Sequence, residues 1–393
     1  MTDPVVIVSG ARTPIGSYMG SLASIPTHKL GGLAAREAMT RAGISTDDVD
    51  EVVMGCIGQV GSEAYNARLV SIEAGIPMTA TAYNVNRLCG SGLQAILSGA
   101  MQLQLGQSKV VVAGGNENMS AQPFFDPHAR AGTTLGNRVL IDGTLSLVTD
   151  PWGDYPMGVT AENVARAYNV DRVQQDEWAM RSQSLAAKAI KLNAFAAEMF
   201  SVEVPGKKGV VTVVDSDEHP RPQTTMEILA KLRPSFSTDG TVTAGNSSGI
   251  NDAGAATVLM LESEAKARGL SPLGRLMGWA SHGCEPSLMG YAPVGAISKV
   301  LDKLGMSVND MDVVELNEAF AAQVIAVIRD AGLDADRTNP NGGAIALGHP
   351  VGATGAILTN KLLHDLHSRD LDRGMVTMCI GGGQALAAVF ERA

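Results

Sequence analysis

Cys89 and His349 are the two residues whose chemical types and surroundings best suit catalysis. Cys89 stands directly before the turn Gly90-Ser-Gly92, and a stretch with a helical apolar face follows it. Backbone N–H groups and the helix dipole at such a turn stabilise a thiolate, and the glycines let the backbone approach a ligand. Cys89 is therefore a candidate nucleophile, although burial as a small hydrophobic residue is the alternative for any free cysteine.

His349 is the candidate base for this cysteine. A nucleophilic cysteine needs a base within hydrogen-bond reach, and histidine is the usual one. Glycines and a proline bracket His349, and a helix is expected after it, as after Cys89. We therefore expect the two residues to share one site. A solvated or capping role is expected for the other histidines, which are His28, His128, His219, His282, His364 and His367.

Alternating strands and helices must position these residues. Short β-branched runs predict strands at 5–9, 49–56 and 109–115, and a buried strand ending at 81–85; apolar spacing predicts helices at 30–42 and 93–103. The last third repeats the pattern, with strands at 274–279, 312–317 and 375–379 and helices at 294–304, 320–330 and up to about 367. Such alternation predicts βαβ units, a mostly parallel sheet and two related halves, with the loops of Cys89 and His349 facing each other.

Residues 121–245 interrupt this pattern with many prolines and polar stretches. One helical stretch is expected there, from Thr160 as N-cap to about Leu192. The insertion is too long for a structureless loop. The predicted fold is therefore α/β, with a layered core and an inserted loop subdomain. The expected boundaries are 1–120 for the N-terminal half, completed by 246–270, then 121–245 for the loop subdomain and 271–393 for the C-terminal half.

Composition excludes several functional classes. The chain has 393 residues, of which 45% are hydrophobic, and its net charge of −10 argues against nucleic-acid binding, which requires a basic face. Its four cysteines lack the Cys-x-x-Cys spacing of a zinc site, and no metal is expected. No signal peptide or membrane-spanning apolar run is recognisable. These features predict a soluble, cytoplasmic protein without a membrane association.

Four dispersed segments resemble the motif blocks of the thiolase family, in the same order and with the same spacing. They are Asn86-Arg-Leu-Cys89-Gly-Ser-Gly, Asn317-Glu-Ala-Phe320, Gly342-Gly-Ala-Ile-Ala-Leu-Gly-His349-Pro and Cys379-Ile-Gly-Gly-Gly. The likeness runs through the whole chain. It implies the layered α-β-α-β-α thiolase fold and an acyltransferase of fatty-acid metabolism, including β-oxidation. Such an enzyme reversibly joins an acyl-CoA to acetyl-CoA, with CoA and acyl-CoA as substrates and no cofactor.

The resemblance also implies roles for the motif residues. Cys89 would carry the acyl group, His349 would take its proton, and Cys379 would be a second acid/base at the α-carbon of acetyl-CoA. His349, with a water held by Asn317, would form one oxyanion hole, and the backbone N–H groups of Cys89 and Gly381 would form the second. The physical need is clear, because losing one oxyanion donor typically costs about 3–4 kcal/mol of barrier.

The same resemblance places CoA on the loop subdomain. Arg221 would meet the adenine nucleotide, and Ser248 would hydrogen-bond the pantetheine. The tunnel wall would be formed by Ala244, Met157, Met289, Ala319 and Phe320. Ordinary roles remain open, as a surface charge for Arg221 and as core for Met157 and Met289.

One departure from the family pattern concerns substrate size. Short-chain acetoacetyl-CoA thiolases carry a histidine before the methionine of the Met-Gly-x-Thr-Ala-Glu-Asn block, where this chain has Pro156. The expected consequence is a pocket that accepts chains longer than acetyl. Two alternatives stay open: a catalytically silent acyl-CoA or lipid-binding protein, and a ketosynthase, which would carry His or Asn in place of Cys379. By analogy with the family, a homodimer or homotetramer is expected.

Overall fold

A ten-stranded sheet forms the centre of the computed structural model, which describes residues 3–393. Strand β2 (Gly16–Ser17) pairs with β12 beside the main path. In spatial order the other strands are β14 (Val313–Leu316), β15 (Arg373–Ile380), β16 (Gln384–Arg392), β13 (Gly274–Gly283), β1 (Val5–Arg12), β12 (Asn251–Leu261), β5 (Val110–Asn118), β3 (Glu51–Gly55) and β4 (Thr81–Val85).

The prediction of a mostly parallel sheet is wrong. Strand β3 runs parallel to β4 and β5, and β14 runs parallel to β15, whereas every other pairing along the sheet is antiparallel. The βαβ rule applies only to strands joined by a helical crossover. Here β15 returns directly into β16 through Gly381–Gly383, and β1 is inserted between β12 and β13 from the far end of the chain.

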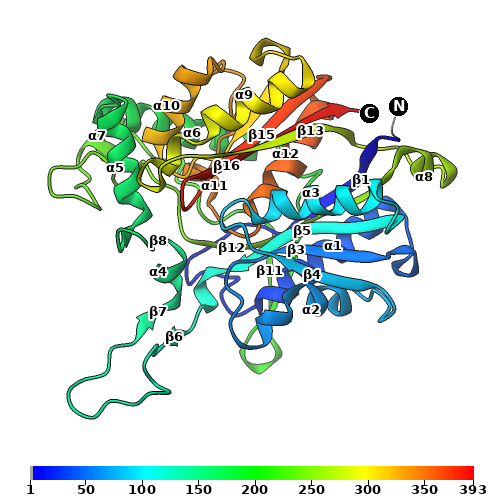
Figure 1. Cartoon of the computed structure of the whole chain (residues 1–393), viewed down its shortest axis with the longest axis horizontal. Coiled ribbons are helices and arrows are strands. Elements are labelled where there is room, and N and C mark those ends of the chain that lie inside the picture. Colours follow the sequence, from blue (N-terminus) through cyan, green and yellow to red (C-terminus); the bar gives the residue numbers. More distant parts are fainter. Residues whose placement is uncertain (1–2) are drawn as a thin grey trace.

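Helices divide the molecule into five layers, which confirms the predicted α-β-α-β-α core (Figure 1). One outer layer holds α1 (Thr27–Ala42) and α2 (Asn66–Glu73) against β1, β12, β5 and β3. The other holds α9 (Pro293–Leu304) and α10 (Ala321–Ala331), with α9 against β13 and β16. Between the two parts of the sheet lie α3 (Ser91–Gln104) and α12 (Thr354–Ser368).

The two middle helices touch at their first turns. Gly92 and Gly355 are each the second residue of their helix. A Cβ on Gly92 would lie 2.9 Å from the backbone nitrogen of Ala356, and a Cβ on Gly355 would lie 2.2 Å from that of Leu93. Only glycine permits such an approach, because the obstacle is backbone on both sides. This contact brings the turns of Cys89 and His349 together, as the predicted relation of the halves requires.

Strand β4, which leads to Cys89, differs from its prediction. A buried strand was expected at 81–85, but Thr81 is exposed and the rest of β4 is only partly buried. The reason is its position, because β4 is the last strand of the sheet and has a neighbour on one side only, among the described residues.

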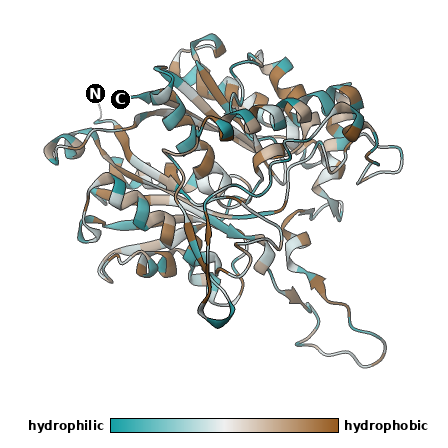
Figure 2. Ribbon diagram, turned by 180° about the vertical axis from the view of Figure 1, so that it is seen from behind, coloured by the Kyte–Doolittle hydropathy of each residue, from teal (hydrophilic) through white to brown (hydrophobic). Residues whose placement is uncertain are grey.

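The loop subdomain, residues 121–245, consists of short strands and four helices, of which α5 and α6 are the longest and pack against α10 of the second half (Figure 1). The loop between β6 and β7 stands away from the body in Figure 2, which also shows hydrophobic residues along the central strands. The elements are β6 (Phe124–Phe125), β7 (Ile141–Asp142), α4 (Gly143–Leu147), β8 (Thr149–Asp150), β9 (Tyr155–Pro156), α5 (Met157–Ala167), α6 (Arg172–Lys191), β10 (Val202–Pro205), β11 (Val211–Val214) and α7 (Met226–Ala230). Two further helices, α8 (Glu262–Ala267) and α11 (Ala344–Leu347), belong to the halves.

The single helix predicted from Thr160 to Leu192 is two helices. Thr160 lies inside α5 and its hydroxyl donates to the carbonyl of Met157, so its predicted N-cap role is wrong. Helix α6 has its own cap, since Asp171 accepts the backbone N–H of Gln174 and Gln174 accepts that of Asp171. This is a capping box, and it starts a new helix there. None of the helices within residues 3–393 combines the length and apolarity needed to cross a membrane.

Candidate active site

Cys89 lies in the turn between β4 and α3, after Leu88, whose φ of 47° is in the left-handed region. The backbone N–H groups of Gly381 and of Cys89 itself face its sulfur and favour the thiolate. Desolvation by the surrounding protein is the larger effect, and the pKa of Cys89 is raised above its usual value. The expected stabilisation of the thiolate is therefore outweighed by burial, which favours the thiol form of Cys89.

His349 has a fixed orientation and is buried at the end of the Gly-rich segment before α12. The Thr354 hydroxyl donates to the carbonyl of Pro350 at 2.9 Å, so it accepts from Nδ1–H of His349 at 2.7 Å. The other nitrogen, Nε2, is then the free acceptor of the neutral ring. Burial lowers the pKa of His349 to about 4, which keeps the ring neutral near pH 7.

Asn317 follows β14 and faces the free nitrogen of His349. Its Nδ2 lies 3.4 Å from Nε2 of His349, and its backbone N–H donates to the carbonyl of Thr377. The side-chain oxygen Oδ1 is buried and has no hydrogen-bond partner among residues 3–393. A buried unpaired acceptor is costly, so this atom suits a small donor such as water. The sequence-predicted pair His349 and Asn317 is thus brought together.

Cys379 lies near the end of β15, where the strand turns back into β16. Its side chain is 1% exposed, and burial raises the pKa of its thiol, as does the nearby Cys89. The turn consists of Gly381, Gly382 and Gly383, of which the last two have φ of 81° and 78°. These left-handed values require glycine and direct the Gly381 backbone toward Cys89.

Apolar side chains from four segments surround Cys379. The predicted tunnel residues Met157, Met289, Ala319 and Phe320 all belong to this cluster, which also contains Ala161, Val242 and Phe236. Phe236 meets the ring of Phe320 edge to face, with ring centroids 6.2 Å apart. The cluster excludes water around the Cys379 sulfur, which strengthens any electrostatic interaction made there.

A separate cavity of about 450 Å³ opens beside α7. Arg221 and Ala244, both predicted to contact CoA, line it together with Gln183, His219 and Leu232. Ser248 is not among its lining residues, but its backbone N–H donates to the carbonyl of Ala319 at 3.0 Å. The segment 242–248 therefore runs from this cavity to the apolar cluster around Cys379.

Two histidines do not have the solvated roles expected for them. His219 lines the cavity, and burial together with Arg221 lowers its pKa to about 4. The pKa of His364, on α12, is lowered to about 4 mainly by burial. Local sequence gave no sign of this, because residues that affect these two pKa values also come from distant parts of the chain, such as Arg41 and Gly10 at His364.

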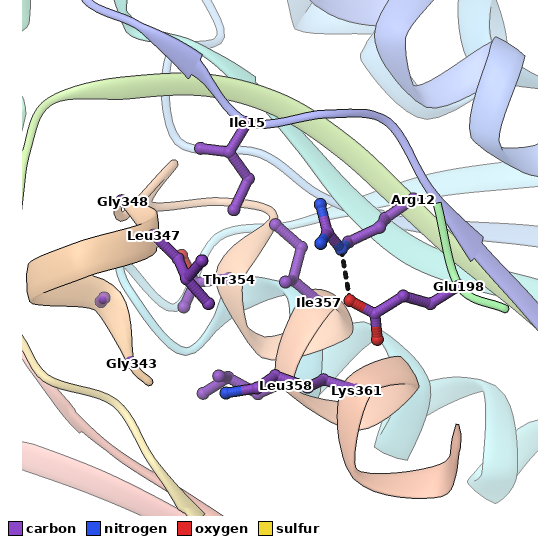
Figure 3. A pocket seen from close by; sticks show the side chains of 11 residues that line it. Arg12, Ile15, Glu198, Gly343, Leu347, Gly348, Thr354, Ile357, Leu358 and Lys361 are labelled. Carbon is purple, nitrogen blue, oxygen red and sulfur yellow. Dashed lines mark hydrogen bonds and ion pairs between the residues drawn. The ribbon is translucent and has the colours of Figure 1, made fainter. Parts of the chain in front are cut away.

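A small cavity of about 20 Å³ lies beside Gly343, Leu347 and Gly348, in the segment that leads to His349 (Figure 3). Arg12, Glu198, Thr354 and Lys361 are among its lining residues, so Thr354 touches both this cavity and His349. Arg12 pairs with Glu198 at 2.6 Å, and this pair lies along one side of the space in Figure 3. The volume suits about one water molecule. It is too small for a substrate, and its ion pairs fasten the loop subdomain to β1.

Sequence reasoning missed two residues that hold the site in place. Thr354 sets the tautomer of His349, and Asn251, the first residue of β12, accepts the backbone N–H of His349 at 2.9 Å. A polar residue one helical turn after the candidate base was a usable signal for Thr354. Asn251 had no such signal, since it is 98 residues away along the chain.

Comparison with known proteins identifies the arrangement. A family described as "Thiolase, N-terminal domain" matches residues 5–263, and "Thiolase, C-terminal domain" matches residues 270–392. The chain is 48% identical to beta-ketothiolase BktB of Cupriavidus necator, covering 100% of both chains. It is 46% identical to an acetyl-CoA acetyltransferase of Pseudomonas aeruginosa, covering 99% of both. Human mitochondrial 3-ketoacyl-CoA thiolase in complex with CoA superposes with a TM-score of 0.96 at 42% identity, covering 100% of this chain and 98% of that one.

Proposed function

Because this chain belongs to the thiolase family and is an acyltransferase, we propose that Cys89 carries the acyl group during its reaction. The reaction is the reversible Claisen condensation of an acyl-CoA with acetyl-CoA, or the cleavage of a 3-ketoacyl-CoA by CoA. The observation that carries the assignment is that Cys89 and Cys379 lie close enough to affect each other beside the Gly381 turn, while Val351, two residues after His349, packs in one cluster with Cys89. The two alternatives, a silent binding protein and a ketosynthase, are not favoured, since all three reactive residues are present.

In the first half-reaction, His349 acts as the base for Cys89. Its Nδ1 holds a proton against Thr354, so only Nε2 can accept the Cys89 proton as the sulfur attacks the carbonyl carbon. The developing oxyanion is stabilised by the backbone N–H groups of Cys89 and Gly381, which already face the sulfur. The thioester bond to CoA then breaks, the departing CoA sulfur takes the proton of the nearby Cys379 thiol and leaves as CoA, and the acyl group remains on Cys89.

In the second half-reaction, the Cys379 thiolate removes an α-proton from acetyl-CoA, and the resulting carbanion attacks the acyl-cysteine. The Cys89 sulfur is released and takes back the proton held by His349. In cleavage, the same thiol returns the proton to the departing enolate. The enolate oxygen is stabilised by the protonated Nε2 of His349 and by a water held at Asn317, whose Oδ1 lacks a partner among residues 3–393. The apolar cluster around Cys379 keeps other water away from the carbanion.

We propose that CoA lies along the cavity beside α7. Arg221 at its rim supplies a positive charge for the nucleotide phosphates, and Ala244 forms part of its wall. Ser248 lies where the pantetheine passes toward Met289, Ala319 and Phe320. Segment 242–248 supports this path, since Ala244 lines the cavity and Val242 belongs to the cluster around Cys379.

The first test is CoA-dependent cleavage of 3-ketoacyl-CoAs of four to about ten carbons by the wild type and Cys89→Ala. The wild type is expected to cleave them, and Cys89→Ala to lose at least about 10³-fold in kcat, as for removal of a nucleophile. Cys284→Ala, which removes a thiol near Cys379 that the proposed reaction does not use, is the matched control and is expected to keep its activity. A wild type that binds acyl-CoA but cleaves none would instead support the silent binding protein.

We further propose that Pro156 widens the acyl pocket beyond acetyl. Pro156 directly precedes Met157, and the Met157 side chain lies 3.2 Å from the position of a Cβ on Gly381. Proline donates no hydrogen bond and fixes the backbone before α5, so it changes the wall near Cys89. Pro156→His is expected to shift the preference toward four-carbon substrates. An unchanged chain-length profile would contradict this proposal.

A homodimer or homotetramer is also inferred, along with a cytoplasmic location and a role in fatty-acid metabolism. Strand β4 leaves one edge of the sheet without a strand neighbour among the described residues, and unpaired edges are normally covered. Large apolar side chains are exposed on the loop subdomain, at Phe124, Leu135, Val139, Leu140 and Trp152. The four cysteines are free, as a reducing compartment would keep them. Light scattering after size exclusion measures the assembly directly.

A further inference from the structure

Glu117 is a buried carboxylate that the reaction above does not use. It lies near the end of β5 and its side chain is 0% exposed. No lysine, arginine or histidine among residues 3–393 forms an ion pair with it, unlike the buried Glu198 and Glu315. Burying a carboxylate without a cation is costly, so its retention points to a specific task.

The carboxylate binds two separate segments through their backbones. Oε2 accepts the N–H of Ile57 at 3.0 Å, and Oε1 accepts that of Gly58 at 3.0 Å. The N–H of Gly352, three residues after His349, also faces it. The fit at Gly352 is tight, because a Cβ there would lie 2.5 Å from Oε2. One side chain thus joins the loop after β3 to the segment between His349 and α12.

Both segments carry a side chain that packs against the proposed nucleophile. Ile57 and Val351 belong to one apolar cluster with Cys89. We propose that Glu117 is a positioning residue for the thiolase reaction, holding segments 56–58 and 351–352 in place so that Ile57 and Val351 fix the Cys89 side chain. This inference rests on the proposed role of Cys89 as the acylated residue.

The negative charge of Glu117 also affects the pKa of Cys89. Burial raises the pKa of Glu117 to about 7, while the N–H groups of Ile57, Gly58 and Gly352 oppose the rise. Negative charge on Glu117 raises the pKa of Cys89. The other titratable groups facing these two residues are the thiols of Cys56 and Cys379, both with raised pKa values of their own. Burial is the larger cause of the raised pKa of Cys89, and the charge of Glu117 adds to it.

Glu117→Gln tests both consequences, since it keeps the shape but replaces one acceptor oxygen by a donor. The pH midpoint for alkylation of Cys89 by iodoacetamide, followed by mass spectrometry, is expected to fall below that of the wild type once the like charge is removed. The kcat of thiolysis is expected to fall about tenfold, as for loss of one buried hydrogen bond, with KM for CoA within about threefold. The CoA cavity shares none of these residues.

Glu162→Gln is the matched control, because Glu162 is equally a buried carboxylate that accepts backbone N–H groups, those of Thr241 and Val242. Its alkylation midpoint is expected to equal that of the wild type. An unchanged midpoint and kcat in Glu117→Gln, or an equal shift in Glu162→Gln, would overturn the inference.

Two further experiments separate the role of Glu117 from a folding defect and from the proposed function. If Glu117→Gln does not fold, Glu117→Asp keeps the charge but is too short to reach both segments. It is expected to lower kcat and leave the alkylation midpoint in place, and wild-type kcat would refute the positioning role. Transfer of a labelled acetyl group from acetyl-CoA to Cys89 in the wild type is measured separately. Its absence would refute the proposed function rather than the role of Glu117.

Discussion

Thr354→Val tests whether one hydroxyl sets the tautomer of His349. Valine has the shape of threonine but has no hydroxyl, so Nδ1–H of His349 loses its acceptor. The ring is buried, with 5% of its surface exposed, and among residues 3–393 no other acceptor for Nδ1 is found. An unpaired buried donor costs about 1–3 kcal/mol. The ring avoids this cost by moving its proton to Nε2, and then it cannot accept the Cys89 proton.

The same free energy sets the expected loss of activity. Each 1.36 kcal/mol is a factor of ten, so kcat/KM for thiolysis is expected to fall roughly 5- to 150-fold. The assay is cleavage of acetoacetyl-CoA by CoA, followed by loss of the 3-ketoacyl-CoA absorbance. Thr354→Ser retains the hydroxyl and is expected to stay within about threefold of the wild type. A valine variant at the wild-type rate, or a serine variant as slow as valine, would refute the reasoning.

Three further predictions concern stability and are measured by urea unfolding. Lys361→Met leaves Glu315 buried without its 2.8 Å partner and is expected to cost about 3–5 kcal/mol at pH 8. The cost should shrink at pH 5.5, since the pKa of Glu315 is already raised to about 7; a loss below about 1 kcal/mol at pH 8 would contradict this. Burial lowers the pKa of His364 to about 4, so the unfolded chain binds its proton more readily between pH 6.5 and 4, and stability is lost as pH falls. His364→Gln should therefore reduce the loss between pH 8 and pH 5 by about 2 kcal/mol, and an identical pH profile would count against it. Asp171→Ala removes the cap of α6 and should cost about 1 kcal/mol, whereas Asp171→Asn, which keeps an acceptor, should cost less than half of that.

Local sequence patterns predicted most of the element types and singled out Cys89 and His349, whose catalytic roles stay predictions. Glycines bracket both Cys89 and His349, and periodic apolar residues mark the helices that follow them, so local patterns were informative there. The assignment of Cys379, Asn317 and the CoA contacts depended on resemblance to a family. Their roles stay predictions, although the structure gathers Cys379 and the tunnel residues in one cluster. The domain boundaries at 120, 245 and 270 also stay predictions, and residues 1 and 2 lie outside the described part of the chain.

Properties that depend on contacts between residues far apart in the chain could not be predicted from local sequence patterns. The sheet is largely antiparallel because β1 pairs with strands that come 250 residues later. The pKa of Cys89 is raised by burial, which a helix-start argument does not include. Glu117 and Asn251 accept hydrogen bonds from backbone N–H groups that are far away in sequence, and residue spacing does not predict such contacts. Thr160 failed as a cap because Pro156 is itself at the N-terminus of α5.

The contact between Gly92 and Gly355 restricts how this protein can change over generations. Each glycine faces backbone atoms of the opposite helix, and no substitution there can remove backbone atoms to make room for a side chain. A substitution at one position therefore has no compensating substitution at the other. If the halves descend from a duplicated gene, the ancestral protein had one glycine at this position and two copies of that protein packed against each other there. After duplication, the requirement for glycine applies to two positions of one chain. A randomised library selected for growth on this activity should return glycine at both positions while the neighbouring helix residues diversify.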